Sequence, residues 1–326
     1  MIENINEKQQ LTTPVLLIAF NRPDTARKVF DCIRSARPTH FYLAVDGARP
    51  NKEGEAELCR QCQEIANLVD WECEVHTLFR DKNVGCGFGP SGAISWAFET
   101  AAELIVLEDD CCPSQSFFTF CEQMLNKYKN DNRIWLVSGL SIYPDHSCFN
   151  GADYLFTHMG LTLGWATWKD RWGEFDMYMR DVPEFIANGG SFNTFPIKKY
   201  AKSYDKSIQY KHQHIEEEVS HSWDSQWDYT RVKNAGLGII PRINLIEYIG
   251  FDNGTHQSDE NGSYVKKALD FDHPIKHPKF VVENKEFDEY FYKHYINPWN
   301  RKIKGIAFYA KNPDKIATRL KRFVGK

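Results

Sequence analysis

The chain lacks long apolar runs. Although 42% of its 326 residues are hydrophobic, no stretch reaches the roughly 18 apolar residues that a membrane-spanning helix needs. Its polar start, MIENINEKQQ, has no apolar segment of the kind found in secretion signals. These absences predict a cytosolic protein, and a chain of this length can bury a large core in one big domain or two small ones.

The body of the chain also lacks a basic excess. Nine Lys and Arg residues against the single Asp314 give residues 301–326 a charge of +8, so the total of −4 leaves −12 on the first 300 residues. An acidic body argues against general nucleic-acid binding, which needs a basic face on the folded domain. The tail can place Ile316, Leu320 and Phe323 on one helical face, which predicts either a helix on an anionic membrane or a solvated terminal helix.

Disulfide and zinc-finger patterns are missing as well. The nine cysteines are odd in number and fall between residues 32 and 148, which favours reduced thiols. Cys59 and Cys62 form a CxxC, but they lie in the amphipathic stretch EAELCRQCQEIANLVD, and no second pair follows at zinc-finger spacing. We therefore expect both thiols to pack in the core.

The glycine-rich stretch NVGCGFGPSG, at 83–92, matches neither common nucleotide motif. It lacks the Lys-Ser/Thr that ends a P-loop, and it lacks the GxGxxG spacing of dinucleotide sites. Two interpretations stay open. The glycines either let backbone approach a ligand at the start of a helix, or they form a flexible loop.

Strand-like and helix-like segments alternate over the first 140 residues. Strands are expected over 14–20, 41–45, 74–79, 104–110 and 134–138, and helices over 25–35, 58–68, 93–102 and 116–129. Strands separated by helices of this length imply right-handed crossovers. The predicted fold class is therefore α/β, with a mostly parallel, Rossmann-like central sheet and flanking helices.

The most informative segment is LIVLEDD, in which an apolar strand runs directly into Glu108, Asp109 and Asp110. Ligands gather at the carboxyl ends of strands in open α/β sheets, and closely spaced carboxylates suit Mg²⁺ or Mn²⁺. A solvated turn is the plain alternative. Further polar residues follow the first two strands, so one crevice is expected to collect Asn21, Arg22, Asp46 and the acidic triplet.

The second half is rich in aromatic residues, with GWATW at 164–168. Most of these rings are expected in the core, but Trp165 and Trp223 could instead form a platform for the apolar face of a sugar. Asp224 stands between Trp223 and Trp227. Flanking rings would disfavour its ionised form and raise its pKa toward the range of a general base, whereas a helix-capping Asp is the alternative.

Taken in order, several motifs resemble the GT-A glycosyltransferases, above all the N-acetylglucosaminyltransferase I type and the bacterial family 2-like sugar transferases. The motifs are NR after the first strand, AVDG after the second, VLEDDCCPSQSFFTF, GWATW, WDSQW and IGFDNGTHQ. The resemblance covers roughly residues 12–258. Each motif alone is modest, and their shared order carries the likeness.

The resemblance implies roles for the acidic triplet. Asp110 would bind the divalent cation, Mn²⁺ or Mg²⁺, that bridges the donor diphosphate, while Asp109 and Glu108 would contact the ribose and the sugar of the donor. The rest of the nucleotide pocket would be formed by Asn21, Arg22, Asp46 and Lys82.

The resemblance also points to a catalytic base. The Trp-Asp motif places this role on Asp224, with Trp165 and Trp223 near the acceptor. The relatives have one residue between that Asp and the next Trp, where this chain has Ser225 and Gln226, so Asp228 stays an alternative. The late His256 would ligand the metal or contact the diphosphate, or it is an ordinary turn histidine.

These implications describe an inverting, metal-dependent hexosyl- or N-acetylhexosaminyltransferase of polysaccharide biosynthesis. It would move a sugar from a nucleotide-diphosphate sugar, expected to be a UDP-sugar, to a glycan or lipid-linked acceptor at the inner face of the membrane. The expected parts are a flexible N-terminus (1–11), a nucleotide-sugar-binding half (12–140), an acceptor-binding and catalytic half (141–260), and an extension with a basic amphipathic helix (261–326).

Two other functions stay open. Sugar-nucleotide nucleotidyltransferases share a related sheet, but they have a glycine-rich start followed by a basic residue, and IAFNRPDTAR lacks that glycine run. A non-catalytic sugar- or nucleotide-binding module would account for aromatics and carboxylates. It would not explain why an acidic triplet and a separate Trp-flanked Asp occur together.

Overall fold

A sheet of eight strands forms the centre of the computed structural model, which describes residues 10–143, 147–217, 222–250 and 267–296. The strand order is β3-β2-β1-β4-β8-β6-β9-β7. Strands β7 and β8 run antiparallel to their neighbours, and the other strands run parallel to one another. The bounds are β1 Val15–Ala19, β2 His40–Val45, β3 Glu74–Phe79, β4 Glu103–Glu108, β6 Ile134–Ser138, β7 Tyr154–Thr157, β8 Trp165–Trp168 and β9 Leu237–Pro241.

The expected alternation of strands and helices is confirmed in the first half. Strands β1, β2, β3 and β4 are connected through α1 (Pro23–Ala36), α2 (Glu55–Gln63) with the short 3-10 helix η1 (Glu64–Leu68), and α3 (Gly85–Ala97). Every residue of β1 is buried, as expected for a parallel strand that is covered on both faces. The predicted α/β class with a mostly parallel sheet is therefore correct.

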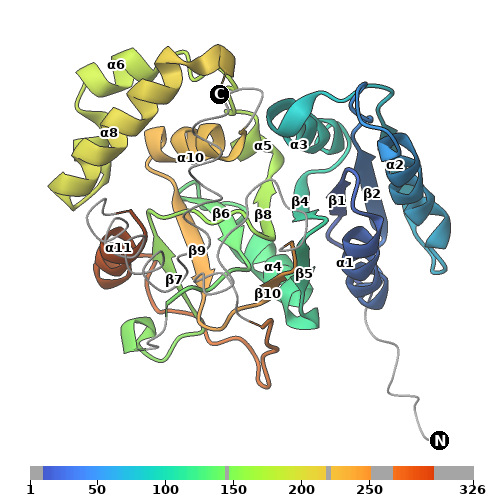
Figure 1. The fold of residues 1–326 in the computed structure, drawn as a ribbon. Helices are drawn as coiled ribbons and strands as arrows, with labels where there is room; N and C mark the ends of the chain where they lie inside the picture. Colours follow the sequence, from blue (N-terminus) through green and yellow to red (C-terminus); the bar gives the residue numbers. More distant parts are fainter. Residues whose placement is uncertain (1–9, 144–146, 218–221, 251–266, 297–326) are drawn as a thin grey trace, which may run out of the picture.

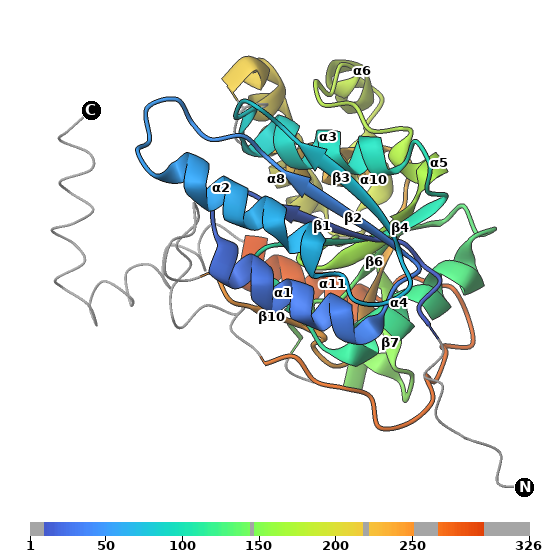
Figure 2. The same cartoon turned by 90° about the vertical axis from the view of Figure 1, so that its right-hand side faces the viewer.

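Helices cover both faces of the sheet. Helices α1, α2 and α4 (Gln115–Tyr128) share one hydrophobic core with β1, whereas α3 and α10 (Asp224–Lys233) pack on the other face. Figure 2 shows the two helical layers on either side of the strands. Cys59 and Cys62 lie in the first of these cores, so the expectation that both thiols pack there is confirmed, while the reduced state of the nine cysteines stays a prediction.

Helices of very different lengths surround the strands of the second half. They are η2 (Ser147–Phe149), α5 (Lys169–Trp172), α6 (Val182–Ala187), α7 (Gly190–Thr194), α8 (Lys198–Gln213), α11 (Lys285–Phe291) and the π-helical turn η3 (Tyr292–Ile296). In Figure 1, α6 and α8 lie beside α10, at the end of the molecule away from α1 and α2. Among the described helices, none is long and apolar enough to cross a bilayer.

The glycine-rich stretch belongs to helix α3, which begins at Gly85 and ends at Ala97, earlier at both ends than the helix expected over 93–102. The alternative of a flexible loop is therefore wrong. A Cβ at Gly89 would lie 3.4 Å from Asp46 Oδ2, which is an ordinary van der Waals contact, and one at Gly92 would meet only the end of the flexible Arg80 side chain, 2.9 Å from its Nη2 atom.

A second, two-stranded sheet brings distant segments together. Strand β5 (Cys111–Pro113) directly follows the acidic triplet and pairs antiparallel with β10 (Ile246–Tyr248). This pairing places the segment around Tyr248 next to the end of β4. His256, the basic tail at 301–326 and residues 1–9 fall outside the described residues, so the predictions made for them stay predictions.

Candidate active site

The acidic triplet lies where β4 gives way to β5. Glu108 is the last residue of β4 and is partly exposed, whereas Asp109 and Asp110 are only 3% and 8% exposed. Burying two carboxylates is costly unless a cation or hydrogen bonds compensate them. The alternative of a plain solvated turn is therefore wrong.

Arg22 supplies the compensating charge. It stands between β1 and α1, and because β1 and β4 are neighbours, its side chain reaches the triplet. The Arg22 guanidinium donates to Asp109 and, at 2.9 Å, to Asp110 Oδ2. Burial alone would lower the pKa of Arg22, but the two carboxylates raise it well above its ordinary value, so the guanidinium is charged.

One guanidinium does not balance the negative charge. Burial, followed by the charges of Asp110 and Asp109, raises the pKa of Glu108 to about 8, and a further contribution comes from Asp224. Burial also raises the pKa of Asp109, to about 6, although Arg22 opposes this shift. A raised carboxyl pKa marks a place where another negative charge is unfavourable and a cation would be stabilised.

This surplus charge is the feature that fits a divalent cation. Asp110 would hold Mg²⁺ or Mn²⁺, with the Glu108 carboxylate beside it, because both ions prefer oxygen ligands. Within the described part of the chain, the triplet does not form a group of three ligand atoms that all lie within 4.8 Å of one another. That arrangement suits an ion that takes one or two protein carboxylates and completes its shell with water and phosphate.

Asp46, directly after β2, is hydrogen-bonded to the loop that leads into α3. Its carboxylate accepts hydrogen bonds from the backbone N–H groups of Gly47 and Val84 and from Asn83 Nδ2, at 3.0 to 3.2 Å. Burial raises the pKa of Asp46, while the bonds from Val84 and Gly47 lower it. Asp46 therefore holds the start of α3 in place, and Asn83, which takes part in this contact, was not among the predicted site residues.

Lys82 is exposed in the same loop. Its backbone passes so close to Gly47 that a Cβ there would lie 2.4 Å from the Lys82 carbonyl carbon. Only glycine fits at position 47, so the AVDG motif serves loop packing in this structure. The role of Lys82 in donor binding stays a prediction.

Asn21 takes part in a network that sequence reasoning missed. Its Nδ2 donates to Glu55 Oε1 at 2.9 Å, and buried Glu55 also accepts from Arg49, whose backbone N lies 2.7 Å from Glu55 Oε2. The hydrogen bond from Arg49 is the largest cause that lowers the pKa of Glu55 to about 2. The only local signal was an acidic residue in the first turn of a helix that follows Gly54.

The segment that follows strand β10 lies next to the triplet. The Ile249 backbone N donates to the Asp110 carbonyl oxygen at 2.9 Å, and a Cβ at Gly250 would lie 2.9 Å from the Asp110 Cβ. Burial and then the charge of Asp110 raise the pKa of Tyr248 to about 12. Tyr248 is therefore a neutral hydroxyl beside the triplet, and it was not among the predicted site residues.

Asp224 is the first residue of α10 and is exposed. Its Oδ1 accepts hydrogen bonds from Ser222 Oγ at 2.5 Å and from the Ser225 backbone N at 2.8 Å. Trp223 and Trp227 do not enclose it, because both rings turn into the core. The expected desolvation of Asp224 is therefore wrong, although its charge does contribute to the raised pKa of Glu108.

The proposed acceptor rings are core residues. Trp165 and Trp223 are 1% and 5% exposed and stack with their centroids 5.7 Å apart, and Trp172 and Trp227 pack against them. Neither ring offers a face to a ligand. The interpretation of these residues as a sugar platform is therefore contradicted, and the alternative of core packing holds.

Asp228, the alternative base, is bound to a cation. Its Oδ1 accepts from Arg231 Nη2 at 2.6 Å, and Arg231 is 1% exposed. Arg231 also donates to the Gly236 carbonyl oxygen at 2.7 Å, and Gly160 leaves room for it, since a Cβ there would lie 3.0 Å from Arg231 Nε. The carboxylate of Asp228 therefore compensates a buried charge.

A cavity of about 230 Å³ opens beside Asp224. Helices α8 and α10 form two of its walls, and polar side chains of both signs line it together with apolar ones. Its lining comprises Leu136, Gly160, Thr162, Tyr204, Ser207, Ile208, Lys211, Asp224, Ser225, Trp227, Asp228 and Arg231. Such a mixture suits a ligand that carries several hydroxyl groups on an apolar frame.

Comparisons with known proteins do not name a family. No family model matches the sequence, and no curated protein matches it significantly. Similar solved structures include the 4-diphosphocytidyl-2C-methyl-D-erythritol synthase of Anaerococcus prevotii, with 10% identity over 52% of this chain and 75% of that chain and a TM-score of 0.32. They also include HddC from Yersinia pseudotuberculosis, with 9% identity over 49% and 78% of the two chains and a TM-score of 0.30. Similarities this weak carry no argument about function.

Proposed function

We propose that the protein is an inverting, metal-dependent glycosyltransferase that uses a nucleotide-diphosphate sugar. One arrangement carries the proposal: Asp224, the first residue of α10, lines the cavity between α8 and α10 and lies near enough to Glu108, at the end of β4, for its charge to help raise the pKa of that carboxyl. Groups suited to the leaving diphosphate and a carboxylate suited to the acceptor hydroxyl would therefore act on a common donor and acceptor, although more than a hundred residues separate them in the sequence.

The triplet and Arg22 would bind the donor. When bound, a Mg²⁺ or Mn²⁺ ion would offset the negative charge that gathers on the leaving diphosphate. Asp110 would hold that ion, and the Arg22 guanidinium, already 2.9 Å from Asp110, is placed to donate to phosphate oxygens as well. Asp109 keeps Arg22 oriented by accepting a hydrogen bond from its guanidinium.

Asp224 would act as the general base. An acceptor hydroxyl loses its proton to the Asp224 carboxylate while its oxygen bonds to the anomeric carbon of the donor. The bond between that carbon and the diphosphate oxygen breaks, and the nucleoside diphosphate leaves with the electron pair. A single direct attack inverts the anomeric centre. Asp228 is less suited to this role because it already pairs with buried Arg231.

The cavity between α8 and α10 would receive the acceptor. Asp224 lies in its lining, so a sugar ring held there would present a hydroxyl to the proposed base. Ser207, Thr162 and Lys211 line the same cavity and could bond further hydroxyl groups. The acceptor surface is thus assigned to this cavity, in place of the buried rings of Trp165 and Trp223.

The experiment is a transfer assay with a panel of nucleotide sugars, Mn²⁺ and simple glycan or glycolipid acceptors. We expect release of nucleoside diphosphate together with an acceptor that mass spectrometry shows to be heavier by one sugar. Asp224→Asn should lower kcat by about a hundredfold or more, which is the usual contribution of a general base, and leave donor binding unchanged. Glu184→Gln is the matched control, since Glu184 is also an exposed acid in the first turn of a helix.

The same assay separates the competing functions. A nucleotidyltransferase would release pyrophosphate from a nucleoside triphosphate and a sugar phosphate, and that result would replace the present proposal. Donor binding without turnover for any acceptor would favour a binding module. Full activity of Asp224→Asn would show that the base lies elsewhere.

A further inference from the structure

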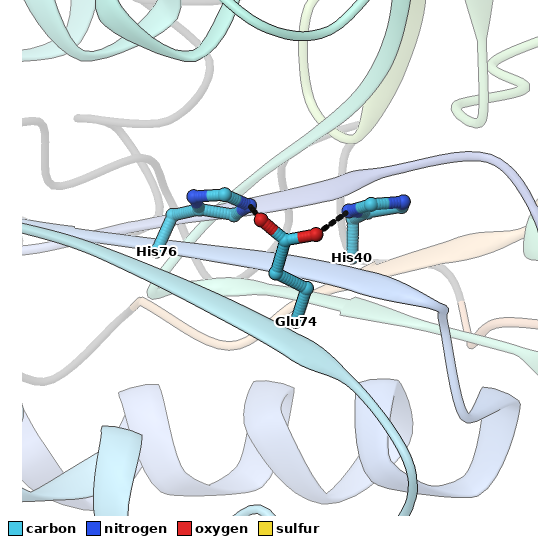
Figure 3. Close-up of side chains that lie close together, drawn as sticks. All are labelled: His40, Glu74 and His76. Carbon is cyan, nitrogen blue, oxygen red and sulfur yellow. Dashed lines mark ion pairs between the residues drawn. The ribbon is translucent and has the colours of Figure 1, made fainter.

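Two histidines and a glutamate gather on the exposed edge of the sheet, outside the proposed active site. His40 begins β2, while Glu74 and His76 belong to the edge strand β3. His40 pairs with Glu74 in the register of the two parallel strands, and His76 lies two residues further along β3. Side chains two residues apart in a strand share a face, so all three project from the same side of the sheet. Figure 3 shows the Glu74 carboxylate between the two imidazole rings.

The three side chains already point their ligand atoms at one another. His40 Nδ1 lies 3.4 Å from Glu74 Oε2, and His76 Nε2 lies 3.2 Å from Glu74 Oε1. One ligand atom from each residue lies within 4.8 Å of the other two. Tetrahedral bonds of 2.0 to 2.1 Å require ligand atoms about 3.4 Å apart, so small side-chain rotations would complete the geometry for zinc.

Neighbouring residues hold the His76 ring in one orientation. Its ring stacks on Tyr42 with a centroid distance of 4.3 Å and an interplanar angle of 12°, and the Tyr42 hydroxyl is itself bonded to Thr100 Oγ1 at 2.8 Å. The His76 Nε2 atom is buried and has no hydrogen-bond partner among the described residues, despite its proximity to Glu74. A buried nitrogen that lies 3.2 Å from a carboxylate oxygen without forming a hydrogen bond would be better satisfied by a cation bound between the two.

We propose that His40, Glu74 and His76 bind one zinc ion, or a transition-metal ion of similar preference. Two imidazoles and a carboxylate form a common donor set for zinc, and the partial exposure of His40 and Glu74 leaves the fourth position open to water. The site lies at the amino-terminal ends of β2 and β3, whereas Asp46 and the acidic triplet lie at the carboxyl ends of their strands. The ion would therefore tie the edge strand β3 to β2, a structural role that does not depend on the proposed transfer reaction.

The test is a calorimetric titration of the full chain with Zn²⁺, in excess Mg²⁺ to fill oxygen sites and with a non-chelating reductant to keep thiols reduced. We expect one equivalent of zinc whose affinity falls about tenfold or more in His76→Ala, His40→Ala and Glu74→Gln. Zinc at a hundredfold excess over the wild-type dissociation constant should raise the melting temperature by about 4 °C in the wild type and by about 2 °C or less in these three variants. Glu74→Gln keeps the size of the side chain, so its loss of zinc would reflect the missing charge and not a folding defect.

His214→Ala is the matched control, since His214 is exposed on the far side of the molecule, at the end of α8. This variant should bind zinc as the wild type does. In Co²⁺-loaded protein, visible bands without thiolate charge transfer are expected for a site made of nitrogen and oxygen. If the three variants bind the same number of equivalents with unchanged affinity, or if the Co²⁺ spectrum shows thiolate ligands, the proposal is overturned.

Discussion

Arg22 Nη2 lies 2.9 Å from Asp110 Oδ2, and the same guanidinium bonds Asp109. An arginine from the end of one strand thus neutralises part of an acidic triplet at the end of the neighbouring strand. The contact keeps two buried carboxylates in place, but it does not prevent burial and the charges of Asp110 and Asp109 from raising the pKa of Glu108 to about 8. It makes Arg22 a structural residue as well as a candidate ligand for the donor.

Removing the Arg22 charge should destabilise the fold. In Arg22→Gln, Asp109 would remain buried without its cation, and breaking a buried pair in this way costs about 3 kcal/mol. Urea unfolding at pH 7 measures the loss. Arg27→Gln, which removes an exposed pair with Asp31, should change the unfolding free energy by less than about 0.5 kcal/mol. Equal effects in the two variants would contradict the role assigned to Arg22.

Asp110→Asn should weaken the binding of Mn²⁺ and of the nucleotide sugar together. The amide can still accept the hydrogen bond from Arg22 but cannot offer a charged oxygen to a cation. We expect a loss of about tenfold or more in Mn²⁺-dependent donor affinity, measured by calorimetry with and without a chelator. Glu103→Gln, at the other end of β4, should bind as the wild type does. Metal-independent donor binding by the wild type would refute this prediction.

Neutralising Asp228 should lower the free energy of unfolding more than neutralising Asp224, although both acids belong to α10. Asp228→Asn leaves the buried guanidinium of Arg231 without its counter-charge, and we expect a loss of about 3 kcal/mol in unfolding free energy. Asp224→Asn alters an exposed residue and should cost less than about 1 kcal/mol, the larger part of it from the first turn of the helix. Denaturant curves of both variants, compared at one pH, test the assignment.

Trp165→Ala should act on stability and not on acceptor affinity. The ring is buried among three other tryptophans, so its removal leaves a cavity and should cost about 3 to 5 kcal/mol. Thermal unfolding gives the cost, and the acceptor KM of the protein that remains folded should be unchanged. A raised KM at wild-type stability would restore the sugar platform that the structure contradicts.

Asp288 should make stability depend on pH. It is fully buried in α11 and accepts a hydrogen bond from Thr157, and burial raises its pKa to about 7. Below about pH 4 the Asp288 carboxyl is neutral in both the folded and the unfolded chain, so its burial is not penalised. As the pH rises from about 4 toward 7, the carboxyl ionises in the unfolded chain but stays neutral in the folded one, and the free energy of unfolding falls. The loss can reach about 4 kcal/mol, from roughly three pKa units at 1.36 kcal/mol each.

Asp288→Asn cannot ionise and should therefore be more stable than the wild type at pH 8, with a flatter profile between pH 4 and 7. Urea unfolding over this range measures the difference. Glu289→Gln, an exposed neighbour in the same helix, is the control and should follow the wild-type profile. A variant profile as steep as that of the wild type would show that another group is responsible.

The sequence by itself determined the elements whose signal is local. A short apolar run such as PVLLIAF must be buried on both faces, and a helix with Pro at its first position and apolar residues at helical spacing must cover it, so β1 and α1 were predictable. The position of the acidic triplet was predictable from the local sequence as well, because an apolar strand that stops at three carboxylates ends at the edge of the sheet.

Only the tertiary structure decided which groups meet and which are buried. Whether a tryptophan stacks on a ligand or packs in the core depends on helices far away in sequence, and α3 and α10 bury Trp165 and Trp223. The pairing of Arg22 with Asp110, the exposure of Asp224 and the meeting of His40 with Glu74 all arise across neighbouring strands or between the two halves. The burial of a side chain and the charge around it depend on all of its neighbours in space, and a short stretch of sequence does not say which residues those neighbours are.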